Sequence, residues 1–365
     1  MEEKRKGKVQ TVLGLIEPDQ LGITHMHEHI FINYLDFFLK PTDKEQSCCC
    51  VGHEDSDHKH VPLEDQKINI KNMHWVQYNY NKNLHNLQLD EEDVAISELE
   101  LYKKCGGKTI LDVTTEGIGR DPERCKRVSQ KLNLNIVVGA GYYLEKTIGK
   151  LVSNTPVEDM EEKIVKQVLE GIDNTGIKAG IIGEVGCSYP LSANETKSLI
   201  ASARAQKRTG ASITIHPGRS TKSCSEILNV LKDNGADLTR VVMGHIDRTV
   251  HDLNIMLDIA KTGCVLEFDL FGMEISYYPF GGDVMGMASD NQRIDWIKSL
   301  IDAGYGKNIV ISQDIYTKHR LVTYGGHGYH HILFNIVPRM LKHGITQENI
   351  DDMLINTPKR ILTIV

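Results

Sequence analysis

The sequence predicts a (β/α)8 barrel, and two observations carry that prediction. Eight short runs of β-branched and apolar residues recur along the chain, and most are separated by segments of helix length with apolar residues every three to four positions. Several of these segments end at glycine, as a helix C-terminus commonly does. The chain has 365 residues, which is long for an ordinary domain but within the range of one barrel. We therefore expect residues 1–365 to form a single barrel domain.

The expected elements follow in order along the chain. KVQTVLG and LIEP predict an N-terminal hairpin over about residues 8–18. The predicted strands are LGITHMHE, KTILDVTT, NIVVGAG, AGIIGEVG, ASITIHP, TRVVMGH, CVLEFDLFG and NIVISQD. Helical spacing is clearest in the segments 157–172, 194–210, 224–235 and 290–304. The long insert 35–89 interrupts this series, and we expect a packed subdomain that caps the barrel mouth, because it contains Trp75 and two tyrosines.

Composition excludes several classes of partner. The chain has 42 basic and 49 acidic residues, a formal net charge of -7 and no long basic block, which argues against nucleic-acid binding. The N-terminus lacks the apolar core of a signal peptide, and no apolar run approaches the ~20 residues of a membrane span. We expect a cytosolic protein without a membrane partner, and leave a homodimer open.

The eight cysteines do not form a disulfide pattern. Five are scattered singly, so we interpret them as free thiols in a reducing compartment. The others form the run 48–50, which three histidines follow in CCCVGHEDSDHKH. Adjacent cysteines do not easily reach one tetrahedral ion, so we favour an exposed polar loop over a metal site.

Side chains that commonly bind metals follow five of the predicted strands. In such a barrel the active site lies at the C-terminal ends of the strands. The candidate ligands there are His27, His29, Glu184, His216, His245 and Asp314. Alternation along the first strand predicts that His27 and His29 share one face. His25 is expected on the same face but deeper, so we interpret it as a core residue.

Six protein ligands exceed the number that one zinc ion uses in an open catalytic site. They suit two divalent ions that share a bridging carboxylate and a bridging hydroxide. We assign His27, His29 and Asp314 to one ion, and His216 and His245 to the other, with Glu184 as the bridge. The imidazole-rich ligand set favours Zn²⁺ and leaves manganese and iron open.

Six motifs, in this order and at these strand ends, resemble the phosphotriesterase family of the amidohydrolase superfamily. They are HEHIF, VTTEGIGRD, AGIIGEVGCS, HPGRS, GHIDR and SQDI. GKVQTVLGLIEP, DLFG, YGGHGY and NTPKRIL add a narrower resemblance to the animal phosphotriesterase-related proteins. That resemblance implies a zinc-dependent barrel hydrolase that cleaves the amide bond of N-acetyltaurine to taurine and acetate.

One position departs from the founding phosphotriesterases, which have a bridging carboxylated lysine after GII. Gly183 stands there in this chain, and the candidate bridge is the next residue, Glu184. A shift of one residue normally turns a side chain to the other face, so we predict a local twist or bulge. Lys178 lies too early in the strand to substitute.

The expected reaction is attack of the bridging hydroxide on the amide carbon. Asp314 is the predicted catalytic residue, which orients the hydroxide and transfers its proton to the leaving amine. A sulfonate substrate requires a cation, and Arg219 and Arg248 follow His216 and His245 by three residues each. The alternative for Arg248 is a structural pair with the adjacent Asp247.

Other residues near the strand ends have weaker assignments. Tyr142 and its neighbour Tyr143 are candidates for the pocket wall. The basic run 318–320 is expected to be solvated. We expect a small anionic substrate. The alternative function is that of a lactonase or phosphotriesterase, in which the same site would attack a lactone carbonyl or phosphorus. A catalytically silent barrel is the remaining alternative.

Overall fold

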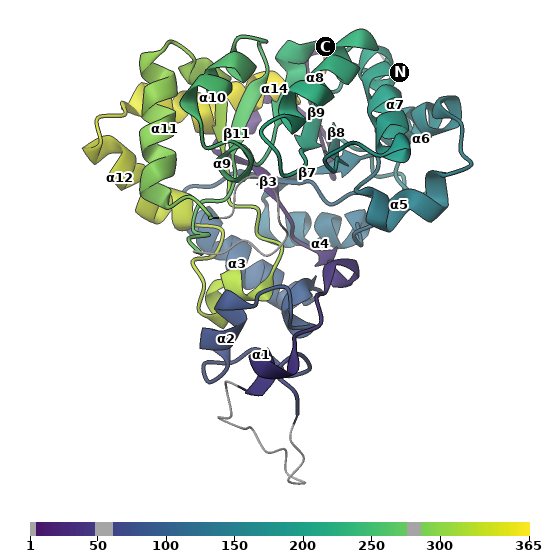
Figure 1. Ribbon diagram of the computed structural model, residues 1–365. Coiled ribbons are helices and arrows are strands. Elements are labelled where there is room, and N and C mark those ends of the chain that lie inside the picture. The colour runs from purple at the N-terminus through teal and green to yellow at the C-terminus, as the bar shows by residue number, and fades with distance from the viewer. Residues whose placement is uncertain (1–4, 48–60, 276–285) are drawn as a thin grey trace.

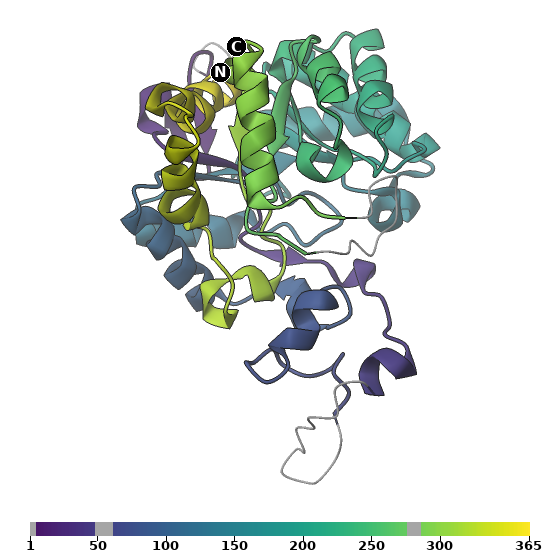
Figure 2. The same ribbon diagram turned by 60° about the vertical axis from the view of Figure 1, so that its left-hand side comes forward.

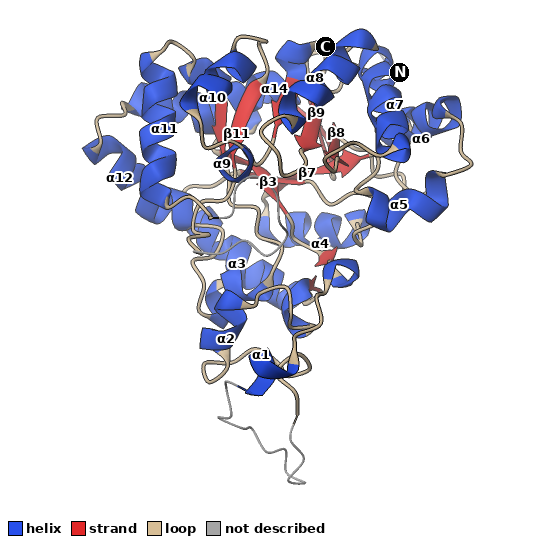
Figure 3. Cartoon of the chain, in the orientation of Figure 1, coloured by secondary structure: helices blue, strands red, loops and turns tan. Residues whose placement is uncertain are grey.

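The computed structural model describes residues 5–47, 61–275 and 286–365. Within them, eight parallel strands form one sheet in the order β12-β11-β10-β9-β8-β7-β6-β3 (Figure 3). The strands are β3 (Thr24–Glu28), β6 (Thr109–Asp112), β7 (Asn135–Ala140), β8 (Ile181–Gly186), β9 (Ile213–His216), β10 (Val241–Met243), β11 (Val265–Phe268) and β12 (Ile309–Ile311). Each coincides with a predicted strand. The cluster of cysteines and histidines in 48–60 lies outside the described residues.

Hydrogen bonds across the seam between β3 and β12 close the sheet into a barrel. The backbone N–H of Asp314 donates to the His27 carbonyl at 3.1 Å. The Ser312 hydroxyl accepts from the His27 N–H at 3.0 Å and donates to its carbonyl at 2.8 Å. The predicted (β/α)8 barrel is therefore confirmed.

Helices surround the barrel (Figures 1 and 2). Those between successive strands are α3 (Glu92–Lys104), α4 (Pro122–Leu132), α5 (Glu145–Val152), α6 (Val157–Leu169), α7 (Ala193–Thr209), α8 (Ser223–Asp233), α9 (Ile246–Thr249), α10 (Leu253–Ala260) and α11 (Asp290–Asp302). After β12 come α12 (Val337–Lys342), α13 (Gln347–Asp351) and α14 (Thr357–Leu362). Gly210 ends α7 with a φ of 68°, a left-handed conformation that glycine adopts without a Cβ clash. Among the described residues, no helix is long and apolar enough to cross a membrane.

The two ends of the barrel differ in what covers them. The N-terminal hairpin, β1 (Val9–Thr11) with β2 (Gly14–Ile16), joins the C-terminal segment through a bridge from Val9 to Thr363. Both chain ends lie on the side away from the insert (Figure 1). The insert lies toward the C-terminal ends of the strands, so the structure places it at the mouth that contains the candidate site.

The described part of the insert has a small core of its own. Its elements are η3 (Leu35–Phe37), α1 (Asp43–Ser47), α2 (Met73–Tyr78), η4 (His85–Leu87) and β5 (Gln88–Leu89), which pairs with β4 (Ile32–Asn33). The buried apolar cluster comprises Leu63, Ile68, Met73, Trp75 and Val76. Asn86 connects the insert to the loop after β12, because its side-chain oxygen accepts from the His319 N–H at 2.8 Å.

The expectation that His25 shares the inner face of the first strand with His27 and His29 is wrong. Its ring packs on Tyr102 of α3, with 4.6 Å between the ring centroids, on the outer side of β3. Met26 instead belongs to the apolar cluster that fills the barrel. A register irregularity between His25 and Glu28 interrupts the strict alternation on which the expectation depended.

Candidate metal centre

The structure brings the six predicted ligands together at the C-terminal ends of the strands. Among the described residues, three sets have ligand atoms within 4.8 Å of one another, and one of them is His27, His245 and Asp269. The other two consist entirely of predicted ligands: His27, His29 and Asp314, and Glu184, His216 and His245. These two sets correspond to the two ions assigned from the sequence.

Glu184 lies between the two sets. Its Oε1 is 3.4 Å from His29 Nε2, and its Oε2 is 3.4 Å from His27 Nε2. The same Oε2 is 3.0 Å from His216 Nδ1 and 3.5 Å from His245 Nε2. A carboxylate in this position can contact ions in both sets.

A bulge in β8 turns Glu184 toward the barrel interior. The register with β9 shifts between Ile182 and Val185, and Gly183 has a φ of 109°. A Cβ on Gly183 would meet the Thr214 carbonyl oxygen at 2.1 Å, so glycine is required at this position. The local irregularity expected from the sequence is therefore present.

Two candidate ligands have a backbone conformation that is rare for residues other than glycine. His245 has a φ of 53° and Asp314 a φ of 47°. The Glu28 carboxylate fixes the loop around Asp314 by accepting from the N–H groups of Gln313, at 2.9 Å, and Ile315, at 3.1 Å. Such conformations persist where the surrounding structure determines them, and they cluster at functional sites.

Three side chains orient the imidazoles of His27, His29 and His245 from outside the ligand set. Asp269 is 2.9 Å from Nδ1 of His245 and 3.3 Å from Nδ1 of His27. Glu267 is 3.1 Å from the same His27 nitrogen, and Thr114 Oγ1 is 2.8 Å from His29 Nδ1. Carboxylates and hydroxyls in this position fix the ring orientation of metal-binding histidines. The sequence reasoning missed Glu267 and Asp269, although acidic residues two positions apart in CVLEFDLFG were a usable signal.

The charges of the cluster complement one another. Burial raises the pKa of Glu184, but His27, His216 and His245 outweigh burial and hold that pKa well below its usual value. Burial likewise opposes protonation of His27, but Glu184 and Asp269 raise its pKa well above the usual value. Asp314 has a lowered pKa despite burial, chiefly through its hydrogen bond with His29. The site thus favours the ionised forms of Glu184 and Asp314, which face positive charge.

The residues present fit divalent metal ions. Within the described residues, His27 Nε2 is buried and makes no hydrogen bond, with Glu184 Oε2 near it at 3.4 Å, while its Nδ1 faces two carboxylates. An imidazole held through Nδ1 presents Nε2 for coordination. Four imidazoles and two carboxylates are also the ligand types that first-row divalent metals accept.

A small cavity adjoins this cluster. It is lined by His29, Tyr34, Tyr143, His216, Arg219, Arg248, Asp314 and Tyr316. Tyr34 and Tyr316 were not predicted from the sequence, and their rings pack 5.0 Å apart. Of the two neighbouring tyrosines, Tyr143 lines this cavity. Tyr142 does not, and its ring contacts Lys163 instead, with the ammonium 5.5 Å from the ring centroid.

The two arginines predicted to hold the substrate both reach this cavity. Arg248 is buried, with its Nη2 3.1 Å from His216 Nε2 and 3.2 Å from the Pro217 carbonyl oxygen. The structural alternative, a pair with Asp247, is wrong, because Asp247 forms a buried ion pair with Arg293 at 2.6 Å.

The expectation of a solvated basic run at 318–320 is also wrong. Lys318, His319 and Arg320 are all buried. Lys318 forms ion pairs with Asp90 and Glu91, which directly follow the insert, at 2.9 and 2.7 Å. Arg320 donates to backbone carbonyls at 2.9 and 3.0 Å. The loop after β12 therefore uses Lys318 to bind the segment that directly follows the insert, and Arg320 to bind the backbone at Phe271 and Gln313.

The fold and this cluster define a (β/α)8 barrel with candidate divalent-metal ligands at the C-terminal ends of its strands. The model of the phosphotriesterase family matches residues 7–362, and the chain belongs to that family. It is 65% identical over 368 residues to the N-acetyltaurine hydrolase of Dictyostelium discoideum, covering 99% of each chain. It is 44% identical to a phosphotriesterase-related protein of Nematostella vectensis, over 98% of this chain and 99% of that one. A resiniferatoxin-binding protein from Rhodobacter sphaeroides has the same fold, with a TM-score of 0.90 at 32% identity, over 98% of this chain and 95% of that one.

Proposed function

We propose that this protein is a zinc-dependent amidohydrolase that cleaves N-acetyltaurine to taurine and acetate. The observation that carries the proposal is one cavity bordered by candidate metal ligands and by two guanidinium groups. The name of the Dictyostelium relative, 65% identical over the full length, supports the choice of substrate.

The proposed cofactor is two Zn²⁺ ions per chain, held by His27, His29, Glu184, His216, His245 and Asp314. Bound there, the ions would supply a hydroxide nucleophile near neutral pH and polarise the scissile carbonyl. Asp314 borders the cavity and is the proposed catalytic acid–base group, which accepts the proton of the nucleophile and delivers it to the leaving amine. Tyr143 contacts His216 Nδ1 at 3.2 Å and orients that ring from the cavity wall.

Arg219 and Arg248 are the proposed sulfonate-binding residues. Both line the cavity, and the Arg248 side chain is almost completely buried. A guanidinium presents planar N–H donors that suit an oxyanion, and its charge is strongest where water is excluded. The pair would select an anionic substrate over a neutral one.

The direct test is to incubate zinc-loaded protein with N-acetyltaurine and to measure free taurine. A chelated sample gives the metal dependence, and N-acetyl-β-alanine, the carboxylate analogue, gives the preference for the sulfonate. We expect chelator-sensitive taurine release that clearly exceeds release from the analogue. No release from protein that retains its zinc would reject this substrate and direct the search to lactones and phosphoesters, which the same centre can attack.

Arg219 permits a cleaner test of substrate charge than Arg248, which touches a candidate metal ligand. Arg219→Gln should raise KM for N-acetyltaurine about ten-fold or more, with a smaller effect on an uncharged N-acetyl amine, because a charge-assisted hydrogen bond contributes about 1.5–3 kcal/mol. Arg204→Gln is a matched control, since Arg204 forms an exposed ion pair with Glu158 on the helical shell. Equal changes in KM for charged and uncharged substrates would exclude a sulfonate contact.

A further inference from the structure

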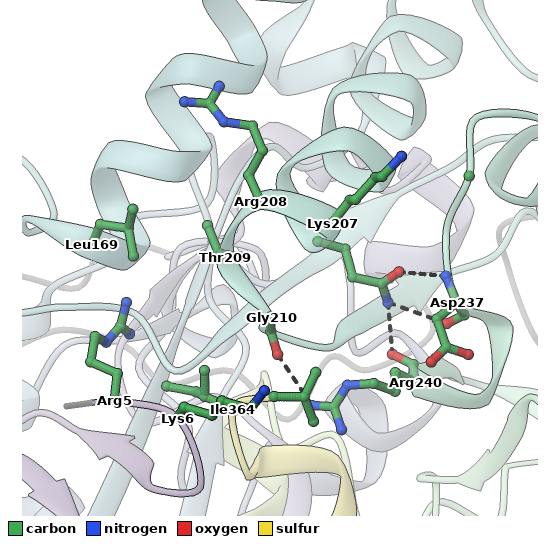
Figure 4. Close-up of a pocket in the computed structure, with 13 residues that line it drawn as sticks. Arg5, Lys6, Leu169, Lys207, Arg208, Thr209, Gly210, Asp237, Arg240 and Ile364 are labelled. Atoms are coloured by element: carbon green, nitrogen blue, oxygen red, sulfur yellow. Dashed lines mark hydrogen bonds between the residues drawn. The ribbon is translucent and has the colours of Figure 1, made fainter. Parts of the chain in front are cut away.

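A second cavity lies at the opposite end of the barrel from the candidate metal centre. Its volume is about 430 Å³, within the range of small-molecule sites. It lies where the N-terminal segment, the end of α7, the turn before β10 and the C-terminal segment meet (Figure 4). Its charged lining residues are Arg5, Lys6, Lys207, Arg208, Arg240 and Asp237. Five of these six residues are basic, although the whole chain has a net charge of -7.

Arg5 is the unusual member of this lining. The residue is only 5% exposed, and all three guanidinium nitrogens are buried without a hydrogen-bond partner among the described residues. Burial lowers the pKa of Arg5, but a guanidinium remains charged near neutral pH. A buried charge without a partner is strongly unfavourable, which points to a missing anion.

The nearby acidic side chains are engaged elsewhere. Asp237 accepts from the N–H and hydroxyl of Thr239, at 2.9 and 2.7 Å, which fixes its own turn. Glu161 and Glu162 pair with Arg208, each at 2.9 Å. These carboxylates therefore do not supply the charge that Arg5 lacks.

Arg240 forms the other wall of the cavity. One of its Nη atoms donates to the Gly210 carbonyl at 3.3 Å (Figure 4). The same nitrogen donates to the Thr363 carbonyl at 2.6 Å, and these bonds fix the guanidinium. Its Nε is buried and has no partner among the described residues. Two guanidinium groups with unused donors thus border one cavity, and neither can lose its charge.

We propose that this cavity binds a phosphoryl group, with the Arg5 guanidinium as the main anchor. A phosphoryl group carries nearly two negative charges near neutral pH and three acceptor oxygens, so it matches several unused donors better than a carboxylate does. The bound group would neutralise Arg5 and join the N-terminal segment to the C-terminal segment that Arg240 holds. The site is separate from the candidate metal centre, and the proposal does not depend on the reaction catalysed there.

The test is a thermal-unfolding series at constant ionic strength with three probes: inorganic phosphate, glucose 6-phosphate and glucose, with chloride as the reference. We expect the phosphate-containing probes to raise Tm and glucose to have no effect. A larger shift with glucose 6-phosphate than with inorganic phosphate identifies a phosphate ester as the ligand, and the reverse identifies free phosphate. Equal Tm in phosphate and chloride would overturn the proposal.

Arg5→Gln should abolish the shift and weaken phosphate binding at least ten-fold. Without phosphate, this variant should be as stable as the native protein or more stable, because the unpaired charge is gone. Arg204→Gln, a charge change on α7 outside the cavity, should retain the full shift. An unchanged shift in Arg5→Gln would refute the role of Arg5. If Arg5→Gln does not fold, calorimetric titration of the native protein with phosphate decides the matter, because heat no greater than that of dilution overturns the proposal.

Discussion

Replacing Asp269 by asparagine should weaken metal binding without disturbing the barrel. Asp269 faces one histidine from each candidate ligand set, at 2.9 Å from His245 Nδ1 and 3.3 Å from His27 Nδ1. It also accepts from the His245 backbone N–H at 2.8 Å. Asparagine has nearly the same volume and retains one oxygen for that backbone bond, but it lacks the charge that makes both imidazoles better ligands.

The size of the expected loss of metal affinity follows from the number of histidines that Asp269 contacts. Loss of one such partner typically lowers metal affinity 10–100-fold, which corresponds to about 1.4–2.7 kcal/mol. Because Asp269 contacts two candidate ligands, we expect a loss near 100-fold in Asp269→Asn. Thr114→Val removes a partner from His29 alone, so its loss should lie nearer 10-fold.

The assay is dialysis against zinc buffered by graded chelator, followed by elemental analysis of zinc per chain. Circular dichroism should show an unchanged fold in each variant. Asp258→Asn is the matched control, because Asp258 forms an exposed ion pair with Lys261 on α10. A zinc-binding curve for Asp269→Asn that superimposes on the native curve would refute the coupling of Asp269 to both ligand sets.

The remaining predictions concern single residues. Glu184→Ala should bind fewer than two zinc ions per chain because it removes the proposed bridge, and two tightly held ions by elemental analysis would defeat that role. His25→Ala should keep its zinc, but its free energy of unfolding in urea should fall by about 2–3 kcal/mol, because the His25 ring is buried against Tyr102. Loss of zinc from this variant would instead make His25 a ligand. Burial, followed by the charge of Arg320, lowers the pKa of His319 to about 3, so the unfolded state takes up the proton first as the pH falls below 6.5. Metal-free protein should therefore lose about 2 kcal/mol of stability from this residue between pH 6.5 and 5. In urea unfolding, the stability of His319→Gln should change by about 2 kcal/mol less between pH 6.5 and pH 5 than that of the native protein. An equal change in the two proteins would contradict the lowered pKa of His319.

The sequence by itself determined the barrel and the residue types at its mouth. Parallel strands in a closed barrel all end at the same edge, so the order of strands and helices was enough to expect His216, His245 and Asp314 at one place. The need for an irregularity at Gly183 was also predictable, because a one-residue shift changes the face of a strand.

Only the tertiary structure decided which groups meet across the barrel. Asp269, directly after β11, contacts His27 and His245, and Tyr34 meets Tyr316 across 282 positions of sequence. Such contacts depend on register and side-chain packing, which local patterns do not encode. For the same reason the sequence predicts a basic residue such as Lys318 to be solvated, yet Lys318 is buried because the carboxylates of Asp90 and Glu91 lie within ion-pair distance.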